Sequence, residues 1–233
     1  MTLQSLDRER HQRVILQMLL SVCRVFGDRL GFKGGTCAAL FHRLPRLSLD
    51  IDFDMLSSFS ADDLDAVAAL LRKNGRIRDS YDKRFTAFFL VDYEPGAPNI
   101  KVELNKRVWK NNIYRRIWML GVEMRIADEQ TLFTNKLVAL TDRKQAVARD
   151  LFDVHYFLTM GFPVSEPLVR ERTGKSLDEY LRFCASAVPK LFTQKNILLG
   201  LGELLDGKQK DLAKTSLIKE TVALIQKLRE KRS

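Results

Sequence analysis

Cysteine is scarce in this sequence: the 233 residues contain three, at positions 23, 37 and 184, and no two lie close along the chain. Such spacing excludes a disulfide framework and a zinc knuckle, and it predicts a protein of a reducing compartment. Histidine is equally rare, and His11, His42 and His155 show none of the spacings of metal ligands. A zinc site and a Ser-His-Asp triad therefore have no support in the sequence.

Long hydrophobic runs are also missing. The longest apolar stretch, residues 14–26, is interrupted by Gln17, Ser21 and Arg24 and is too short to span a bilayer. The first residues are charged and show neither a secretory hydrophobic region nor a small-residue cleavage site. We therefore expect a soluble, cytoplasmic protein that makes no membrane contact.

Acidic residues are in the minority. Lys and Arg number 39 against 29 Asp and Glu, and the formal net charge of +10 favours an anionic partner such as RNA, DNA or a nucleotide. Charge alone does not decide this, because many basic proteins bind no nucleic acid. The apolar share of 45% excludes wholesale disorder, and the length allows one domain with an extension or two small domains.

The hydrophobic pattern changes near residue 127. Before it, alternating residues and turn signals predict strands among helices, and after it the pattern is helical. We therefore predict an α+β fold, with a mixed sheet and flanking helices in residues 1–127 and a helical domain in 128–233. The predicted helices are 6–26, 36–43, 60–74, 128–143, 147–160, 166–173, 176–189, 193–205 and 211–230, and the predicted strands are 30–33, 48–55, 84–93, 100–105 and 117–126.

A glycine turn, Lys33-Gly34-Gly35-Thr36, joins the first predicted strand to the next helix. Glycines at such a turn let backbone N–H groups approach an anion closely, and the helix N-terminus adds partial positive charge. The hydroxyl of Thr36 supplies one more donor. Taken alone, the motif is more typical of a plain tight turn with a threonine cap.

Acidic residues alternate along the strand predicted at 48–55. Asp50, Asp52 and Asp54 share one face of that strand. Asp is depleted in strands and like charges repel, so a bound cation would relieve the arrangement. Asp50 and Asp52, about 6–7 Å apart at Cα, can bind one or two divalent cations. An acidic solvent-facing surface is the alternative.

The strand predicted at 100–105 carries Glu103 on its polar face. If this strand neighbours the aspartate strand, Glu103 completes a carboxylate triad, and two metals in such a site clamp a triphosphate and an attacking oxygen. Glu103 could also accept the proton of the attacking hydroxyl. A surface ion pair with Lys101 or Lys106 is the alternative.

Basic residues are concentrated between positions 101 and 116, with Trp109 and Tyr114 among them. The pattern suits contact with an RNA backbone, with the aromatic rings stacked on unpaired bases. A basic hairpin surface with core aromatics explains it equally well. The candidate RNA contacts are Lys106, Arg107, Lys110, Arg115 and Arg116.

Together these motifs resemble the polymerase-β-type nucleotidyltransferase pattern of a Gly-Gly-Thr turn, an Asp-x-Asp strand and a later acidic strand residue. The local sequence is similar, more narrowly, to the AbiEii/AbiGii toxin family, over roughly residues 28–160. The matching segments are Lys33-Gly34-Gly35-Thr36, Arg46-Leu47-Ser48-Leu49-Asp50-Ile51-Asp52-Phe53, Asn135-Lys136-Leu137-Val138-Ala139-Leu140-Thr141-Asp142-Arg143 and Arg149-Asp150-Leu151-Phe152-Asp153.

The resemblance implies roles for individual residues. The glycine turn would hold the β- and γ-phosphates of an NTP, and Asp50 and Asp52 would bind Mg²⁺ or Mn²⁺. Lys136 matches a helical lysine expected to contact the nucleotide. The remaining positions that the resemblance assigns are Lys33, Arg46, Ser48 and Arg143 for the nucleotide, Glu103 for catalysis, and Asp150 and Asp153 in support.

Apart from the resemblance, two of these assignments have simpler explanations. Lys136 could be a solvated helix lysine. Arg149 and Asp153, four residues apart, could form an ordinary surface ion pair worth about 0.3–0.5 kcal/mol.

The resemblance also implies a nucleotidyltransferase-like fold and a metal-dependent transfer of NMP from an NTP to an acceptor. The implied acceptor is the 3′ end of tRNA, where added nucleotides would block aminoacylation and stop growth. Family members are the toxins of toxin–antitoxin or phage-defence pairs, so a cognate antitoxin is expected. Two alternatives stay open: an NTP-dependent, kinase-like phosphotransferase acting on a protein or small molecule, and a non-catalytic RNA-binding module.

Overall fold

The computed structural model describes residues 8–107, 109–143 and 145–231. The chain divides into two compact units. The sheet unit comprises Met1–Arg43, Leu47–Val108 and Tyr114–Ala127, and the helical unit comprises Leu44–Arg46, Trp109–Ile113 and Asp128–Ser233. No sequence signal indicated that the short segments Leu44–Arg46 and Trp109–Ile113 belong with the C-terminal helices.

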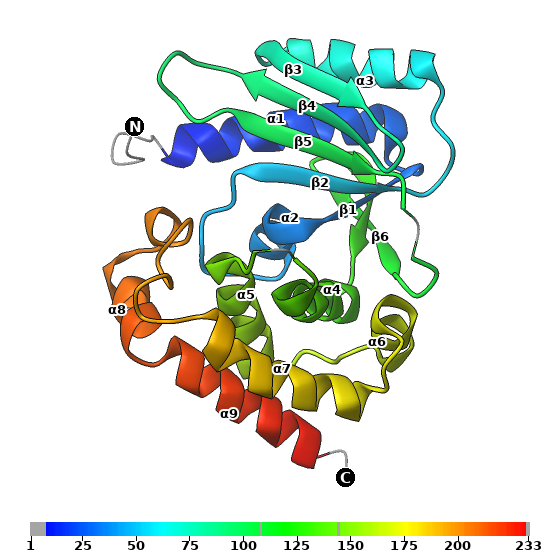
Figure 1. Cartoon of the computed structure of the whole chain (residues 1–233). Coiled ribbons are helices and arrows are strands. Elements are labelled where there is room, and N and C mark those ends of the chain that lie inside the picture. The colour runs from blue at the N-terminus through cyan, green and yellow to red at the C-terminus, as the bar shows by residue number, and fades with distance from the viewer. Residues whose placement is uncertain (1–7, 108, 144, 232–233) are drawn as a thin grey trace. The chain divides into compact units, whose positions relative to one another are not determined.

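Seven strands in the described part of the sheet unit form one mixed sheet, in the order β3-β4-β5-β2-β1-β7-β6 (Figure 1). β2 pairs with β5 and β1 pairs with β7 in parallel, and the other neighbours are antiparallel. The strands are β1 Leu30–Lys33, β2 Asp50–Met55, β3 Arg76–Asp82, β4 Thr86–Asp92, β5 Ile100–Asn105, β6 Tyr114–Met119 and β7 Val122–Ala127. The predicted α+β fold with a mixed sheet is confirmed.

The described part of the sheet unit also contains three helices: α1 (Arg8–Phe26), α2 (Gly34–Phe41) and α3 (Ala61–Arg72). Helix α1 confirms the prediction over 8–26, and positions 6 and 7 lie outside the described residues. Helix α3 begins where Ser60 forms a capping box with Asp63, as the sequence predicts for a serine cap.

One face of the sheet is apolar and forms the core. On β5, Ile100, Val102 and Leu104 are fully buried, while Lys101, Glu103 and Asn105 point to the opposite face. Helices α1 and α3 contact each other and the sheet. Their buried side chains include Met18, Leu19, Val22, Val67 and Leu71. Each such side chain stabilises the fold by about 1.5–3 kcal/mol, and the opposite face of the sheet is left for polar residues.

The helical unit contains α4 (Glu129–Asp142), α5 (Ala148–Thr159), α6 (Glu166–Thr173), α7 (Leu177–Leu191), α8 (Gly207–Thr215) and α9 (Leu217–Glu230). The first four confirm the predicted helices within two residues at each end. Helix α9 packs against α5 and α7. The buried hydroxyl of Tyr180 on α7 lies 3.2 Å from the carbonyl oxygens of Leu137 and Val138 and so joins α7 to α4.

One strand prediction was wrong, and one strand was missed. Residues 117–126 form a hairpin, β6 and β7, instead of one strand, because Leu120 and Gly121 adopt positive φ angles of 49° and 73° and reverse the chain. Strand β3 was not predicted at all. Its side chains are almost all exposed, so it lacks the apolar alternation of a half-buried strand, and it pairs only with β4 at the edge of the sheet.

Two helix predictions in the C-terminal part also need correction. Residues 193–205 form turns and a short 3₁₀ helix, Gly202–Leu204, and Gly200 adopts a positive φ of 64° that an α-helix cannot contain. The helix predicted at 211–230 is two helices, α8 and α9, that meet at Ser216, whose φ of −133° interrupts the first. Within the described residues, no helix combines the length and the apolar character needed to cross a membrane.

Candidate active site

The turn between β1 and α2 brings a glycine against an aspartate of the sheet unit. Gly34 is the first residue of α2. Its φ of +79° is one that residues other than glycine rarely adopt. A Cβ atom built on Gly34 would lie 2.1 Å from Oδ2 of Asp52. The carboxylate of Asp52 therefore occupies the space that the missing side chain leaves, beside the N-terminus of α2.

The aspartates of β2 share the polar face of the sheet with Glu103. Ile51 and Phe53 between them are buried in the core, so Asp50 and Asp52 point the other way. The parallel pairing of β2 with β5 places Asp52 directly opposite Glu103. From the sequence, the pairing of these two strands was only an assumption. The structure shows that β2 and β5 are neighbours.

The donor set of this face suits a hard divalent cation. Within the described residues, no cluster of three or more His, Cys, Asp or Glu side chains is arranged to hold a metal ion by itself. Mg²⁺ is generally held by one or two carboxylates together with substrate phosphates and water, since it keeps part of its hydration shell. Asp50 and Asp52, next to a turn that can receive phosphates, fit that mode of binding.

Asp54, the third aspartate of β2, is buried and contacts residues of three other strands. It is 3% exposed, and its Oδ1 lies 2.5 Å from Nζ of Lys33 and accepts a hydrogen bond of 3.0 Å from Nδ2 of Asn105. The hydroxyl of Tyr114 donates to its other oxygen. Asp54 thereby ties Lys33, at the start of the glycine turn, to β5 and β6. The alternation of aspartates pointed to Asp54, but nothing in the sequence named its partners.

Tyr114 and Thr36 serve the scaffold in this structure. The ring of Tyr114 lies on Gly31, where a Cβ atom would come within 2.3 Å of it. Of the two roles considered for this aromatic residue, the structure therefore supports packing within the protein. Thr36 is 4% exposed, and its hydroxyl donates to the backbone carbonyl of Asp50. That bond fixes α2 to β2, and it gives the hydroxyl a partner other than a phosphate.

In the helical unit, the later motif residues form a buried ion-pair cluster. Arg46 donates from Nε and from its terminal nitrogen to the two oxygens of Asp153, at 2.5 and 2.6 Å. Nζ of Lys136 lies 2.8 Å from Asp150 and 2.9 Å from Asp153. Nε of Arg143 lies 2.9 Å from Oδ2 of Asp150, although no described residue makes a well-aligned hydrogen bond to that oxygen.

Burial and charge explain the titration of this cluster. Burial alone would raise the pKa of Asp153, but Arg46 and Lys136 outweigh it, and the pKa lies below its ordinary value. Burial alone would lower the pKa of Lys136, but Asp153 and Asp150 outweigh it, and the pKa is raised. Asp153 and Lys136 therefore stay ionised near neutral pH.

The burial of this cluster excludes the simpler explanations considered for Lys136 and Asp153. The side chain of Lys136 is only 14% exposed and that of Asp153 is fully buried, so neither a solvated lysine nor a surface pair of Arg149 with Asp153 describes them. The Arg46 side chain is 2% exposed and bound to Asp153. Its guanidinium therefore holds Asp153 in place, whereas Arg143, 45% exposed, offers the most accessible cation of the cluster.

Comparison with known proteins identifies the family of this chain. The family described as "Nucleotidyl transferase AbiEii toxin, Type IV TA system" matches residues 17–219. The chain belongs to the AbiEii family. It is therefore a nucleotidyltransferase, and its family is that of the toxins of type IV toxin–antitoxin systems. No curated protein matches the sequence significantly.

Solved structures support the fold of this AbiEii protein. A structure described as a putative nucleotidyltransferase from H. pylori matches with a TM-score of 0.65 and 21% identity, over 97% of this chain and 96% of that one. JHP933 from Helicobacter pylori matches with a TM-score of 0.61 and 22% identity, over 98% and 95% of the two chains. At these identities the likeness extends to the fold alone.

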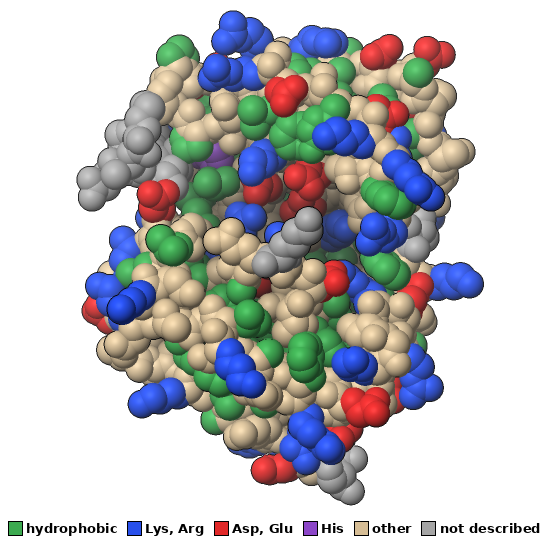
Figure 2. All heavy atoms as spheres, viewed as in Figure 1, with side chains coloured by type: hydrophobic (Ala, Val, Ile, Leu, Met, Phe, Trp, Pro, Cys, Tyr) green, Lys and Arg blue, Asp and Glu red, His purple; other side chains and the backbone are tan. Residues whose placement is uncertain are grey.

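The basic residues predicted as RNA contacts of the AbiEii chain do not form one strip. Lys106 and Arg107 follow β5, whereas Arg115 and Arg116 lie on the edge strand β6, and three strands separate β5 from β6 in the sheet. Lys110 belongs to the helical unit, where its backbone N–H donates to Glu171. Lys106 also pairs with Asp82, and Arg116 lies 2.7 Å from Glu123. Figure 2 shows Lys and Arg side chains spread widely over the face in view.

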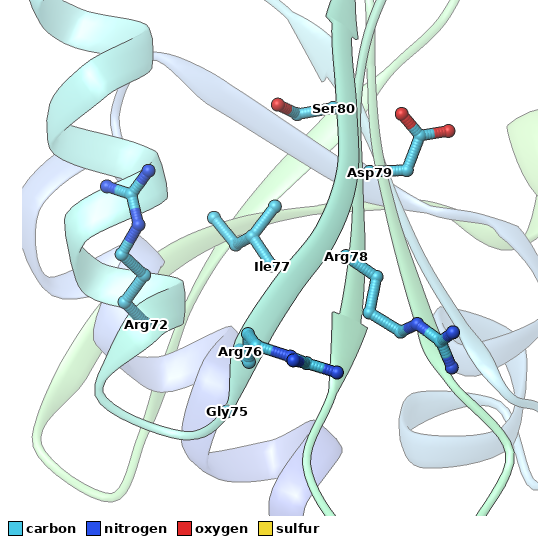
Figure 3. Close-up of a pocket in the computed structure, with 7 residues that line it drawn as sticks. All are labelled: Arg72, Gly75, Arg76, Ile77, Arg78, Asp79 and Ser80. Carbon is cyan, nitrogen blue, oxygen red and sulfur yellow. The ribbon is translucent and has the colours of Figure 1, made fainter.

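A separate open pocket of about 650 Å³ lies between α3 and β3 in the sheet unit. Arg72, Ile77 and Ser80 point into the space between helix and strand, and Arg78 and Asp79 point away from it (Figure 3). None of the residues that line it comes from β2 or β5. This pocket is therefore distinct from the carboxylate face.

Proposed function

We propose that this AbiEii nucleotidyltransferase is metal-dependent and transfers NMP from an NTP to the 3′ hydroxyl of an RNA. The family resemblance points to tRNA as the acceptor. The observation that carries the proposal is the contact of Asp52 with the Gly34 turn, together with its register opposite Glu103. The Gly34 turn, Asp52 and Glu103 supply, in that order, a phosphate-binding turn, a metal-binding acid and a base on one face of one sheet.

The residues of the sheet unit divide the work. Backbone N–H groups of Gly34 and Gly35 hold the β- and γ-phosphates. The hydroxyl of Thr36 does not take part, because it donates to the backbone carbonyl of Asp50. Asp50 and Asp52 hold Mg²⁺ or Mn²⁺, which neutralises charge on the triphosphate when bound. Lys33 is kept beside the turn by Asp54. Ser48 lies just before β2, where it can add a donor to the phosphates.

Glu103 acts as the general base. As the acceptor oxygen bonds to the α-phosphorus, its proton passes to the carboxylate of Glu103. The bond between the α-phosphorus and the bridging oxygen to the β-phosphate breaks, and pyrophosphate leaves with that oxygen. A general base of this kind contributes about 10²–10⁴-fold to the rate.

We assign supporting roles to the cluster of the helical unit. Lys136 and Arg143 contact the nucleotide, and Asp150 and Asp153 position Lys136, to which both are bonded. Arg46 in turn positions Asp153. The support for these roles is that five motif residues from three separate segments meet in one cluster.

In the cell, we propose, the protein acts in the cytoplasm as the toxin of a toxin–antitoxin or phage-defence pair. Nucleotides added to the 3′ end of tRNA would prevent aminoacylation, and a cognate antitoxin would counteract the effect. Expression of the chain alone should arrest growth, and Asp52→Asn should relieve the arrest.

Label transfer tests the reaction. The protein is incubated with each α-labelled NTP, Mg²⁺ and total RNA, and the labelled RNA is resolved by size. We expect transfer to one class of RNA, with Asp52→Asn and Glu103→Gln each reducing the rate more than about 100-fold. Asp65→Asn, at an exposed position on α3, is the matched control and should keep the wild-type rate.

The same assay distinguishes the alternatives. Label that moves only from γ-labelled NTP would contradict NMP transfer and support the kinase-like reaction. RNA binding without turnover of any NTP would support the non-catalytic module. Transfer that persists after complete chelation of divalent cations would contradict the metal dependence and the assignment of Asp50 and Asp52.

A further inference from the structure

One row of side chains crosses five strands of the sheet unit on the carboxylate face. In register, Lys33 lies opposite Asp52, Asp52 opposite Glu103, Glu103 opposite Phe88, and Phe88 opposite Tyr81. Paired residues on neighbouring strands point to the same face, and the strands lie about 4.8 Å apart. The row therefore leads from the acids to two aromatic rings about 10–15 Å from Asp52.

The two rings are stacked. The ring centroids of Tyr81 and Phe88 are 4.7 Å apart and their planes differ by 12°. Phe88 is 9% exposed, but Tyr81, on the edge strand, is 37% exposed. Nζ of Lys83 lies 4.3 Å from the centre of the Tyr81 ring. Tyr81 thus has one ring face toward Phe88 and the ammonium group of an exposed lysine over its ring.

A third ring lies at the tip of the β3–β4 hairpin. Phe85 is 46% exposed, and the guanidinium carbons of Arg84 and Arg107 lie 5.1 and 4.7 Å from its ring centre. We call Tyr81, Lys83, Arg84, Phe85, Phe88 and Arg107 the hairpin platform. It combines exposed aromatic faces with positive charge, which is the combination by which proteins hold unpaired nucleotides.

We propose that the hairpin platform binds the single-stranded 3′ end of an RNA acceptor. Lys83, Arg84 and Arg107, which lie over these rings in the structure, turn to contact the phosphates, and bases take their place on Tyr81 and Phe85. The inference rests on the proposed function, because nucleotidyl transfer is what brings a terminal hydroxyl to Glu103. A few unstacked nucleotides span the distance along the row from the platform to Glu103.

The chemistry of the platform favours a single strand over a duplex. In a duplex the bases stack on one another and their faces are inaccessible to protein rings, whereas unpaired bases can be received by aromatic side chains. The platform therefore selects an acceptor whose last nucleotides are unpaired.

Binding without NTP or metal tests the platform directly. Fluorescence anisotropy measures the Kd of a labelled eight-nucleotide single-stranded RNA with a free 3′ hydroxyl. Tyr81→Ala and Phe85→Ala should each weaken binding at least about fivefold, the loss expected for one stacked base. Tyr81→Phe keeps the ring and should stay within about twofold of wild type. Arg72→Ala, which removes an exposed cation from α3, is the charge control and should have a smaller effect than Tyr81→Ala.

Several results would overturn the proposal. These are wild-type affinity in both alanine variants, an equal loss in Arg72→Ala, and equal binding of a blunt duplex RNA. Circular dichroism and a thermal melt show whether each variant is folded, and Phe85→Ala supplies the answer if Tyr81→Ala is not.

Label transfer separates this inference from the proposed function. Wild-type transfer that both alanine variants leave unchanged would refute the platform and leave the reaction intact. Ring-dependent RNA binding by a protein that transfers no label would refute the reaction and leave the platform intact.

Discussion

Substitution of Gly34 by alanine separates the backbone role of this residue from its contact with Asp52. Gly34 has a φ of +79°, and an alanine there costs about 1–2 kcal/mol of unfolding free energy from backbone strain. Its Cβ would also lie 2.1 Å from Oδ2 of Asp52, so the carboxylate must move. A displacement of about 1 Å at a reacting centre can reduce a rate about 100-fold.

Gly121→Ala is the matched control. Gly121 has a φ of +73°, but no atom lies within 4 Å of a Cβ built there. The two variants therefore share the backbone strain and differ in the collision with Asp52. We expect similar losses of stability in urea denaturation, at about 1–2 kcal/mol, and a roughly 100-fold larger loss of label transfer in Gly34→Ala.

The comparison can refute the reasoning in two ways. If Gly34→Ala transfers label within about twofold of Gly121→Ala, the position of Asp52 against the turn does not matter for catalysis. If Gly34→Ala unfolds far more readily than Gly121→Ala, the collision acts on the fold, and the loss of activity says nothing about the site.

Three further predictions concern buried charge. Asp54→Asn should lower the free energy of unfolding by about 1–3 kcal/mol and reduce label transfer, because Lys33 loses its anion beside the glycine turn; a variant as stable and active as wild type would contradict the anchoring role. Arg46→Met should cost about 3–5 kcal/mol in urea denaturation, because it removes the guanidinium bound to the buried carboxylate of Asp153, which Lys136 also contacts. The pKa of Asp153 is lowered in the folded protein, so the stability that this group contributes is present above the unfolded value of about 3.9 and is lost as pH falls through the folded pKa. The pKa of Lys136 is raised, so the stability that this group contributes is lost as pH rises beyond about 10.4.

Controls for these predictions come from the same helical unit. Arg182 lies 2.7 Å from Asp178 on the exposed side of α7, and Arg182→Met should cost less than about 1 kcal/mol. Asp153→Asn should reduce the acid dependence of the unfolding free energy. An acid dependence as steep as that of the wild type would show that other carboxylates cause it.

The fold was predictable wherever local periodicity carries the information. The alternation of residues 100–105 and the serine cap at position 60 are local signals, and β5 and α3 follow them. Strand β3 escaped prediction because it is stabilised by pairing with β4 at the sheet edge and buries almost none of its own side chains. The break at Ser216 escaped because the apolar pattern continues across it.

For the candidate site, the sequence by itself determined the chemistry: a glycine turn, alternating aspartates and the motif that places the chain in its family. The tertiary structure decided which groups meet. Only strand order places Glu103 beside Asp52 and extends that row to Tyr81, and only packing makes Asp54 the partner of Lys33. The physical reason is that residue type and spacing set local conformation, whereas contacts between segments distant in sequence depend on how the sheet buries its apolar face.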